Sequence, residues 1–175
     1  MDSIVTDPTI DSTDLRKALG NFVTGVTVIT TRGVSGELAG LTVNSFSSLS
    51  LSPPLVMWSL ALSAASFAAF AACTHFTVNV LADDQMHLAE RFARSGGDKF
   101  SGLALRECIP GVPVLDGVAA SFSCRAASRY PGGDHVILIG EVLTYQQSAR
   151  APLLYARGCY ARLKDEKSPP DNRLA

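Results

Sequence analysis

The alternation of apolar and polar residues along the chain predicts a strand-rich protein. Residues 26–31 are β-branched throughout, and the mostly apolar run 38–43 follows after a glycine-containing turn. These two runs therefore predict a β-hairpin near the N-terminus. Further short strands are expected at 55–60, 76–81, 153–155 and 159–161.

A second and longer hairpin is predicted in the C-terminal half. Two apolar runs, 118–130 and 135–145, lie on either side of the turn sequence Pro-Gly-Gly-Asp at 131–134. Proline and glycine pairs of this kind mark turns between strands. Because residues 136–139 are all large and apolar, we expect the second strand to be buried on both faces.

Helical patterns are few and short. Three helices are predicted: at 15–20 after a cap formed by Ser12, Thr13 and Asp14; from the N-cap Ser63 to Ala72; and after caps at Asp83 and Asp84, with Leu88, Ala89, Phe92 and Ala93 on one face. The segment 95–117 is rich in glycine and proline, so we expect it to be mostly loop with short pieces of structure.

Many short strands with few helices favour a mainly β fold, and a β-barrel over a βαβ sheet. At 175 residues and 18.5 kDa, the chain has the length of one domain. We therefore predict a single domain at 14–163, with flexible tails at 1–13 and 164–175.

Charge and cysteine usage exclude several classes of function. Fifteen Lys and Arg residues balance 16 Asp and Glu residues, so there is no electrostatic basis for binding nucleic acid or an anionic membrane. Four cysteines are scattered without a C-x-x-C pair, and only three histidines accompany them. A structural metal or a disulfide framework is therefore not expected. The N-terminus has no signal-peptide pattern, so we predict a cytoplasmic protein with reduced thiols.

The few charges leave a long gap, because residues 38–82 contain no Asp, Glu, Lys or Arg. Within this gap, the 19 residues of 55–73 are long enough to cross a bilayer. Two prolines precede that window, three serines interrupt it, and no Lys/Arg cluster lies beside it. These features favour a buried strand followed by a short helix over a membrane span.

The common catalytic motifs are absent: there is no phosphate-binding P-loop, dinucleotide fingerprint, nucleophile elbow or H-E-x-x-H pair. The uncharged gap instead holds a cluster of hydroxyl and amide side chains, which comprises Thr42, Asn44, Ser45, Ser47, Ser48, Ser59, Ser63 and Ser66. Such groups can bind a polar heterocycle and a phosphate, or they can serve only to cap turns and strand ends. His135 follows the Gly-Asp turn and could face a cleft there, or could be an ordinary packed or surface histidine.

Several segments, taken in order, resemble the flavin reductase domain family of FMN-binding split barrels. They are LRKALGNFVTGVTVIT, GLTVNSFSSLSLSPPLV, FTVNVLADDQMHLAERFA, DKFSG and YPGGDHVILIGEV. The resemblance covers about residues 14–163. Within the family, the chain is most similar to reductase components of two-component flavin-dependent monooxygenases, including those of actinomycete polyketide and antibiotic pathways.

This resemblance implies a homodimeric enzyme that uses NADH or NADPH to reduce FMN or FAD and releases the reduced flavin to a separate monooxygenase. Three other possibilities stay open. One is a different flavin-dependent oxidoreductase on the same fold, and another is a flavin-binding or redox-sensing barrel without catalysis. The third is a ligand-binding barrel that binds no flavin. The sequence does not choose between FMN and FAD, or between NADH and NADPH.

The resemblance also implies site residues. Those matched to the flavin site are Gly40, Leu41, Thr42, Asn44, Ser45, Ser59, Leu60, Ser63, Ser66, Asn79 and Phe92. Those matched to the nicotinamide site are Asp134, His135 and Tyr160. Many members have an Arg or Lys in the phosphate-binding segment, whereas residues 61–66 have none. Phosphate binding would then depend on Ser63, Ser66, backbone amides and the helix dipole, which predicts modest flavin affinity.

Overall fold

The fold is mainly β, as predicted. The computed structural model describes residues 10–164. Its strands are β1 (Thr24–Gly25), β2 (Thr27–Arg32), β3 (Leu38–Val43), β4 (Ser47–Leu51), β5 (Pro54–Ala61), β6 (His75–Val80), β7 (Leu105–Ile109), β8 (Val112–Leu115), β9 (Ala120–Gly132), β10 (His135–Gln147), β11 (Leu154–Ala156) and β12 (Cys159–Ala161). Its helices are α1 (Ser12–Leu19), α2 (Phe67–Ala72) and α3 (Met86–Ala93).

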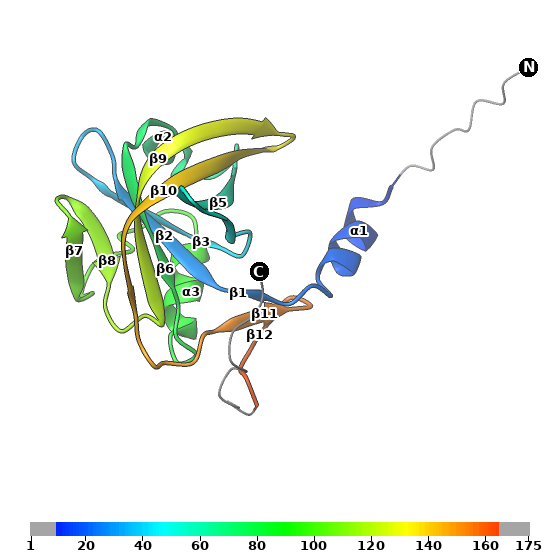
Figure 1. Cartoon of the computed structure of the whole chain (residues 1–175). Helices are drawn as coiled ribbons and strands as arrows, with labels where there is room; N and C mark the ends of the chain where they lie inside the picture. The colour runs from blue at the N-terminus through cyan, green and yellow to red at the C-terminus, as the bar shows by residue number, and fades with distance from the viewer. Residues whose placement is uncertain (1–9, 165–175) are drawn as a thin grey trace, which may run out of the picture.

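One curved antiparallel sheet of seven strands forms the body, in the order β3-β2-β6-β9-β10-β5-β4. The long β9–β10 hairpin supplies two adjacent strands of this sheet, and its tip extends beyond the neighbouring strands (Figure 1). Helix α2 lies at the top of the body and α3 at its lower end in the view of Figure 1. A three-stranded sheet of β1, β11 and β12 and a two-stranded hairpin of β7 and β8 complete the fold.

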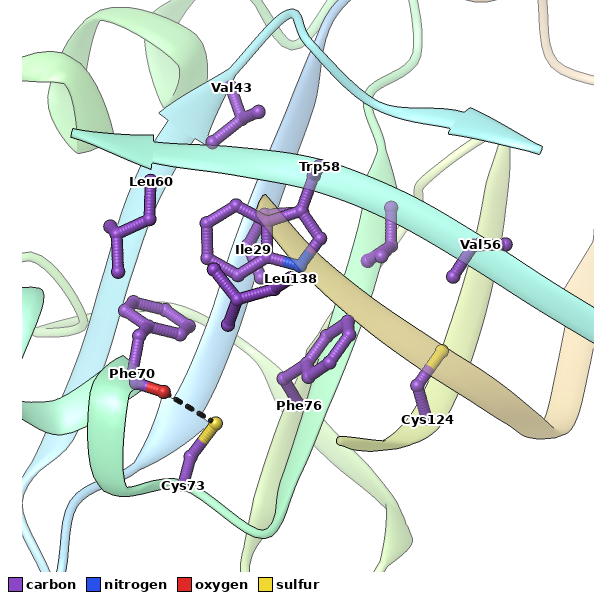
Figure 2. Packing of buried hydrophobic residues seen from close by; sticks show 11 residues of the cluster. Ile29, Val43, Val56, Trp58, Leu60, Phe70, Cys73, Phe76, Cys124 and Leu138 are labelled. Carbon is purple, nitrogen blue, oxygen red and sulfur yellow. Dashed lines mark hydrogen bonds between the residues drawn. The ribbon is translucent and has the colours of Figure 1, made fainter. Parts of the chain in front are cut away.

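Two hydrophobic clusters stabilise this body. The first lies beneath α2, where Trp58 makes edge-to-face contacts with Phe70 at 5.3 Å and with Phe76 at 5.8 Å between ring centroids. Figure 2 shows these three rings pointing toward one another between β5, β6 and α2. The second cluster lies beneath α3 and buries Leu88 and Phe92.

A buried polar network joins the central strands. The Asn79 side-chain amide donates to the Val28 carbonyl at 2.9 Å and to Thr30 Oγ1 at 3.1 Å, while its oxygen accepts the Leu115 N–H at 2.9 Å. Thr77 Oγ1 and Ser123 Oγ lie 3.1 Å apart across β6 and β9. Because burial of an unpaired polar group is costly, these bonds explain how the interior tolerates so many polar side chains.

Most of the predicted strands are confirmed. The hairpin of β2 and β3, the strands β5 and β6, and the last pair β11 and β12 lie within one or two residues of their expected positions. The β9–β10 hairpin also forms, with Gly133 at a φ of +68° in its turn. A positive φ favours glycine, so the turn sequence carried a correct signal.

The helix starts differ from the prediction. In α1 the capping side chain is Asp11, which accepts the N–H groups of Thr13 and Asp14. Helix α2 begins at Phe67 and not after Ser63, because residues 61–66 form turns in which the N–H groups of Ala64 and Phe67 are bonded within the segment.

Helix α3 begins after Gln85 and not after the predicted caps, Asp83 and Asp84. The Gln85 side chain accepts the Ala82 N–H, while Asp84 forms an ion pair with Arg150 and Asp83 one with Arg162. Long-range ion pairs therefore use both carboxylates. On the apolar face of this helix Leu88, Ala89 and Phe92 are buried, but Ala93 is exposed.

The segment 95–117 is mostly loop with short pieces of structure, as expected, and it contains the β7–β8 hairpin. Two other features differ from the prediction. Strand β4 forms at one edge of the seven-stranded sheet, where the sequence predicted no strand. Along residues 136–139, only Leu138 is fully buried in this chain. Among residues 10–164, no helix is long and apolar enough to cross a membrane.

The N-terminal arm stands apart from the body. Helix α1 has no buried residue and projects away from the sheet (Figure 1). Its C-terminal end is fixed by Arg157, whose N–H donates to the Gly20 carbonyl and whose Nε donates to Asn21 Oδ1. The predicted boundary at residue 13 falls inside this helix, and most of the two predicted tails lies outside the described residues.

Candidate functional site

A cleft of about 640 Å³ lies between the start of β3, the segment leading into α2, and the loop before β7. This volume is typical of pockets that hold cofactors or other small molecules. The lining residues are Glu37, Leu38, Ala39 and Gly40; Ala65, Ser66, Ala68 and Ala69; and Gly96, Gly97, Asp98, Lys99, Phe100, Ser101 and Leu105.

The α2 side of the cleft is smooth and apolar apart from one hydroxyl. Ala65, Ala68 and Ala69 have small side chains, so a planar ligand can approach the backbone closely. Ser66 makes no capping hydrogen bond to the helix that follows it, which leaves its hydroxyl for a ligand. The opposite face of α2 carries Phe70 into the core.

The opposite wall supplies a positive charge. Lys99 Nζ donates to the carbonyls of Gly40 at 3.2 Å and Phe92 at 3.0 Å. An ammonium has three protons, so one donor is left. Among residues 10–164 no ion pair involves Lys99. Partial burial lowers the pKa of this ammonium from its usual value, because desolvation disfavours the charged form.

Gly40 allows the two aromatic rings beneath the cleft to pack. A Cβ at this position would lie 2.6 Å from the Phe92 ring and 3.1 Å from the Phe100 ring. These two rings meet edge to face, with 5.1 Å between their centroids. The glycine is therefore required for close packing of the cleft floor.

The Lys99 loop, residues 94–104 between α3 and β7, is held in place by hydrogen bonds within the loop and from α3. Asp98 Oδ1 accepts the N–H groups of Phe100 and Ser101, and the Arg91 guanidinium donates to the Ser101 carbonyl at 2.6 Å. Gly96 and Gly97 both have φ of +75°, a conformation that side chains disfavour. The loop thus presents Lys99 from a defined backbone.

Of the residues matched to the flavin site, the structure brings Gly40 and Ser66 into the lining of this cleft. Thr42 donates to the Ala89 carbonyl, and Ser45 Oγ accepts the Ser59 N–H, so these side chains link elements of the fold. The others range from exposed to buried: Asn44 and Ser63 are exposed, Leu41 is partly buried, and Leu60 and Phe92 are in the core.

Asn79 is the clearest departure from the expected site. Its side chain is fully buried, and its amide nitrogen and oxygen are both bonded to other strands. Within this chain it has no surface to offer a ligand. The structure therefore places Asn79 in the core, and the match of its Val-Asn-Val strand to the family did not reveal this.

The residues matched to the nicotinamide site fall in two places. Asp134 and His135 lie at the β9–β10 tip, where Asp134 Oδ1 is 2.7 Å from His135 Nδ1. This contact lowers the pKa of the Asp134 carboxyl. The Asp134 carbonyl accepts the Leu62 N–H, which joins the tip to the segment leading to Ser66.

Tyr160 lies elsewhere, on β12. Its ring packs edge to face on Tyr155 at 5.5 Å and against the cluster beneath α3. Burial, followed by the neighbouring Tyr155 and Glu90, raises the pKa of its hydroxyl. Within one chain, Tyr160 is therefore separate from the β9–β10 tip.

The arrangement fits a ligand that has a flat apolar part and an anionic part. A model of the Flavin reductase like domain family matches residues 19–164. The chain belongs to this family. Both the family and the mainly β, split-barrel fold class expected from the sequence are confirmed.

The chain is also similar in sequence to individual flavin reductases. The FMN reductase (NADH) SmoA of Agrobacterium fabrum is 45% identical over 152 residues, which cover 87% of this chain and 86% of that protein. The reductase component of the flavin-dependent trigonelline monooxygenase of Acinetobacter baylyi is 41% identical over 84% of this chain, but the chain spans only 47% of its length.

Among solved structures, the NADH:FAD oxidoreductase SgcE6 of Streptomyces globisporus, in complex with NAD and FAD fragments, shares the fold. Its TM-score is 0.84 at 36% identity, and the match covers 91% of this chain and 99% of that one.

FMN and FAD carry phosphate groups, and the cleft offers such a group the ammonium of Lys99 and the hydroxyl of Ser66. The sequence interpretation gave Lys99 no role, because it considered basic residues only within 61–66. The signal was present in the motif DKFSG at 98–102, which carried the family resemblance but received no role. Among the described residues, no cluster of three His, Cys, Asp or Glu side chains could hold a metal ion.

Proposed function

We propose that this protein is an NAD(P)H-dependent flavin reductase whose flavin occupies the cleft between α2 and the Lys99 loop. The observation that carries the proposal is that an alanine-lined wall lies across one cleft from the Lys99 ammonium, which forms no ion pair among residues 10–164. A flat ring and its sugar chain can lie on the alanines, while a phosphate can reach the ammonium.

The chain holds the anionic end of the flavin with few groups. Lys99 donates its remaining proton, and Ser66 adds a neutral hydroxyl. The backbone amides of Ala64 and Phe67 are already bonded within the turns, so they add nothing. One ammonium shared with two carbonyls gives modest affinity, which suits a flavin that binds, is reduced and leaves.

The residues of this chain supply position more than chemistry. When bound, the flavin supplies the redox chemistry, because its N5 accepts a hydride from C4 of the reduced nicotinamide. The chain must hold both rings in contact and exclude water from between them. The apolar walls and the packed Phe92–Phe100 floor of the cleft serve this purpose.

The Asp134–His135 tip is the proposed nicotinamide side. Asp134 accepts a hydrogen bond from His135 Nδ1 and so fixes the orientation of the imidazole, and Nε2 is left to meet a ligand. We expect His135→Ala to raise the KM for the nicotinamide several-fold and to change the KM for flavin little. An unchanged nicotinamide KM would remove His135 from the site.

We further propose a homodimer that passes reduced flavin to a separate monooxygenase. The arm supports self-association, because Leu15, Leu19 and Phe22 are exposed beside a helix with no buried residue. Light scattering on the purified chain should give twice the mass of one chain, and a monomer at micromolar concentration would contradict the dimer. The cytoplasmic location expected from the sequence stays a prediction.

The deciding experiment crosses NADH and NADPH with FMN, FAD and riboflavin in a steady-state oxidation assay. We expect accelerated oxidation of at least one nicotinamide that requires added flavin. If flavin binds but no pair is turned over, the protein is a flavin-binding or sensing barrel. If flavin neither binds nor is reduced, the proposed function is wrong.

A further inference from the structure

Helix α2 forms one wall of the cleft, yet it is too short to hold its own position. It has six residues, and no side chain caps its N-terminus. Isolated helices of this length are unstable in water. The placement of Ser66 and the alanine wall must therefore come from contacts made by the rest of the chain.

One of those contacts is a guanidinium at the far end of the helix. Arg129 Nη2 donates to the Cys73 carbonyl at 2.6 Å and to the Phe70 carbonyl at 3.3 Å. The last carbonyls of a helix lack partners within the helix. A charged donor satisfies them well and also interacts favourably with the helix dipole.

Arg129 belongs to β9, the strand that leads to the Asp134–His135 tip. The same hairpin holds the other end of the segment, because the Asp134 carbonyl accepts the Leu62 N–H at 3.0 Å. Beyond the helix, the Ala126 N–H donates to the Thr74 carbonyl at 2.9 Å. The segment from Leu62 to Thr74 is thus tied to one hairpin at both ends, and its middle lines the cleft.

We propose that Arg129 is a positioning residue that holds α2 against the β9–β10 hairpin and so sets the cleft wall relative to the Asp134–His135 tip. Its effect on turnover rests on the proposed function, but its effect on the wall does not. Loss of the guanidinium leaves the carbonyls of Phe70 and Cys73 without their charged donor. Ser66 and the alanines then lose their fixed position.

Trp58 provides a direct readout of this wall. It is the only tryptophan in the chain, it is fully buried, and its ring contacts Phe70 on the inner face of α2. Figure 2 shows Trp58 and Phe70 facing each other, with Cys73 at the end of the same helix. Displacement of α2 would expose the indole and shift its emission to longer wavelength.

The test compares Arg129→Met, Arg129→Lys and Arg125→Met. Arg125 lies on the same strand but pairs with Glu141 at the surface, so its variant is the matched control. FMN binding is measured by fluorescence titration without nicotinamide. We expect Arg129→Met to weaken FMN binding about tenfold and to shift Trp58 emission. Arg129→Lys, which can still donate to both carbonyls, should restore most of the affinity, and Arg125→Met should match the wild type.

A purely structural role for Arg129 would lower the thermal midpoint alone. Wild-type FMN affinity and unshifted emission in Arg129→Met would therefore overturn the proposal. If that variant does not fold, Arg129→Gln is compared with Arg129→Lys, and equal affinities in these two would overturn it in the same way. A wild type that binds FMN but oxidises no nicotinamide would reject the proposed function only.

Discussion

Two groups of polar side chains, similar in the sequence, differ in what surrounds them. The core network of Thr30, Thr77, Asn79 and Ser123 is buried between strands, and its members are bonded to one another or to the backbone. The polar groups of the cleft, Ser66 and Lys99, lie at a surface and keep bonding capacity for a ligand. Hydroxyl and amide content alone therefore does not identify a binding site, because the same groups stabilise the core when all their hydrogen bonds are made inside the protein.

The largest effect should come from the core network. Asn79→Leu removes the donor to the Val28 carbonyl and the acceptor of the Leu115 N–H. Leaving two buried groups unpaired should lower the free energy of unfolding by about 3–5 kcal/mol. Urea denaturation measures the change. A loss below about 1 kcal/mol would contradict the stabilising role of Asn79 in the core. Weaker flavin binding without loss of stability would support a role of Asn79 in binding the flavin.

Lys99→Met should weaken ligand binding and leave stability nearly unchanged, in contrast to Asn79→Leu. The variant loses the positive charge of the cleft, so FMN binding should weaken at least about tenfold, with little change in the thermal midpoint. Riboflavin lacks the phosphate, so its affinity should not change. Lys17→Met, which removes an exposed lysine paired with Asp14 on α1, is the control. Equal losses for FMN and riboflavin would show that Lys99 does not meet the phosphate.

The same lysine predicts a pH dependence. Because burial lowers the pKa of Lys99, the folded protein loses this proton at a lower pH than an exposed lysine would. FMN affinity should therefore fall as the pH rises through that lowered pKa, while Lys99→Arg should keep its affinity, since arginine stays charged. As the pH rises from the folded pKa to the unfolded pKa of Lys99, the free energy of unfolding of the wild type should increase relative to that of Lys99→Met. The reason is that the unfolded chain binds more protons than the folded chain in this pH range. A flat affinity profile in the wild type would contradict the assignment.

Ser66→Ala should give the smallest effect. A neutral hydroxyl contributes about 0.5–1.5 kcal/mol to a hydrogen bond, so FMN affinity should fall only about threefold. Stability should stay unchanged, because the hydroxyl caps no helix. Ser35→Ala, in the exposed turn between β2 and β3, serves as the control. Lower stability in Ser66→Ala would place this serine with the core network instead.

The local elements were predictable because their signals are local. A continuous β-branched run identified β2, short apolar runs identified β3 and β6, and the Pro-Gly-Gly-Asp turn identified the long hairpin. Helix starts were less predictable, since Asp83 and Asp84 have the character of caps but form ion pairs with Arg162 and Arg150 from distant parts of the chain. Likewise, the uncharged gap of residues 38–82 is not a site as a whole: its strands cross the core, and only parts of it reach the cleft.

The amino-acid pattern was sufficient to predict the strand-rich fold, the family, and the two segments that contribute Gly40 and Ser66. The polar groups that line the cleft became clear only from the three-dimensional arrangement of the chain. Lys99 is 59 residues from Gly40 along the chain, yet its ammonium binds the Gly40 carbonyl and supplies the charge that residues 61–66 lack. Asn79, within a strand that matches the family, turns inward and is fully bonded. Strand and turn patterns depend on neighbours in sequence, whereas burial and charge pairing depend on neighbours in space.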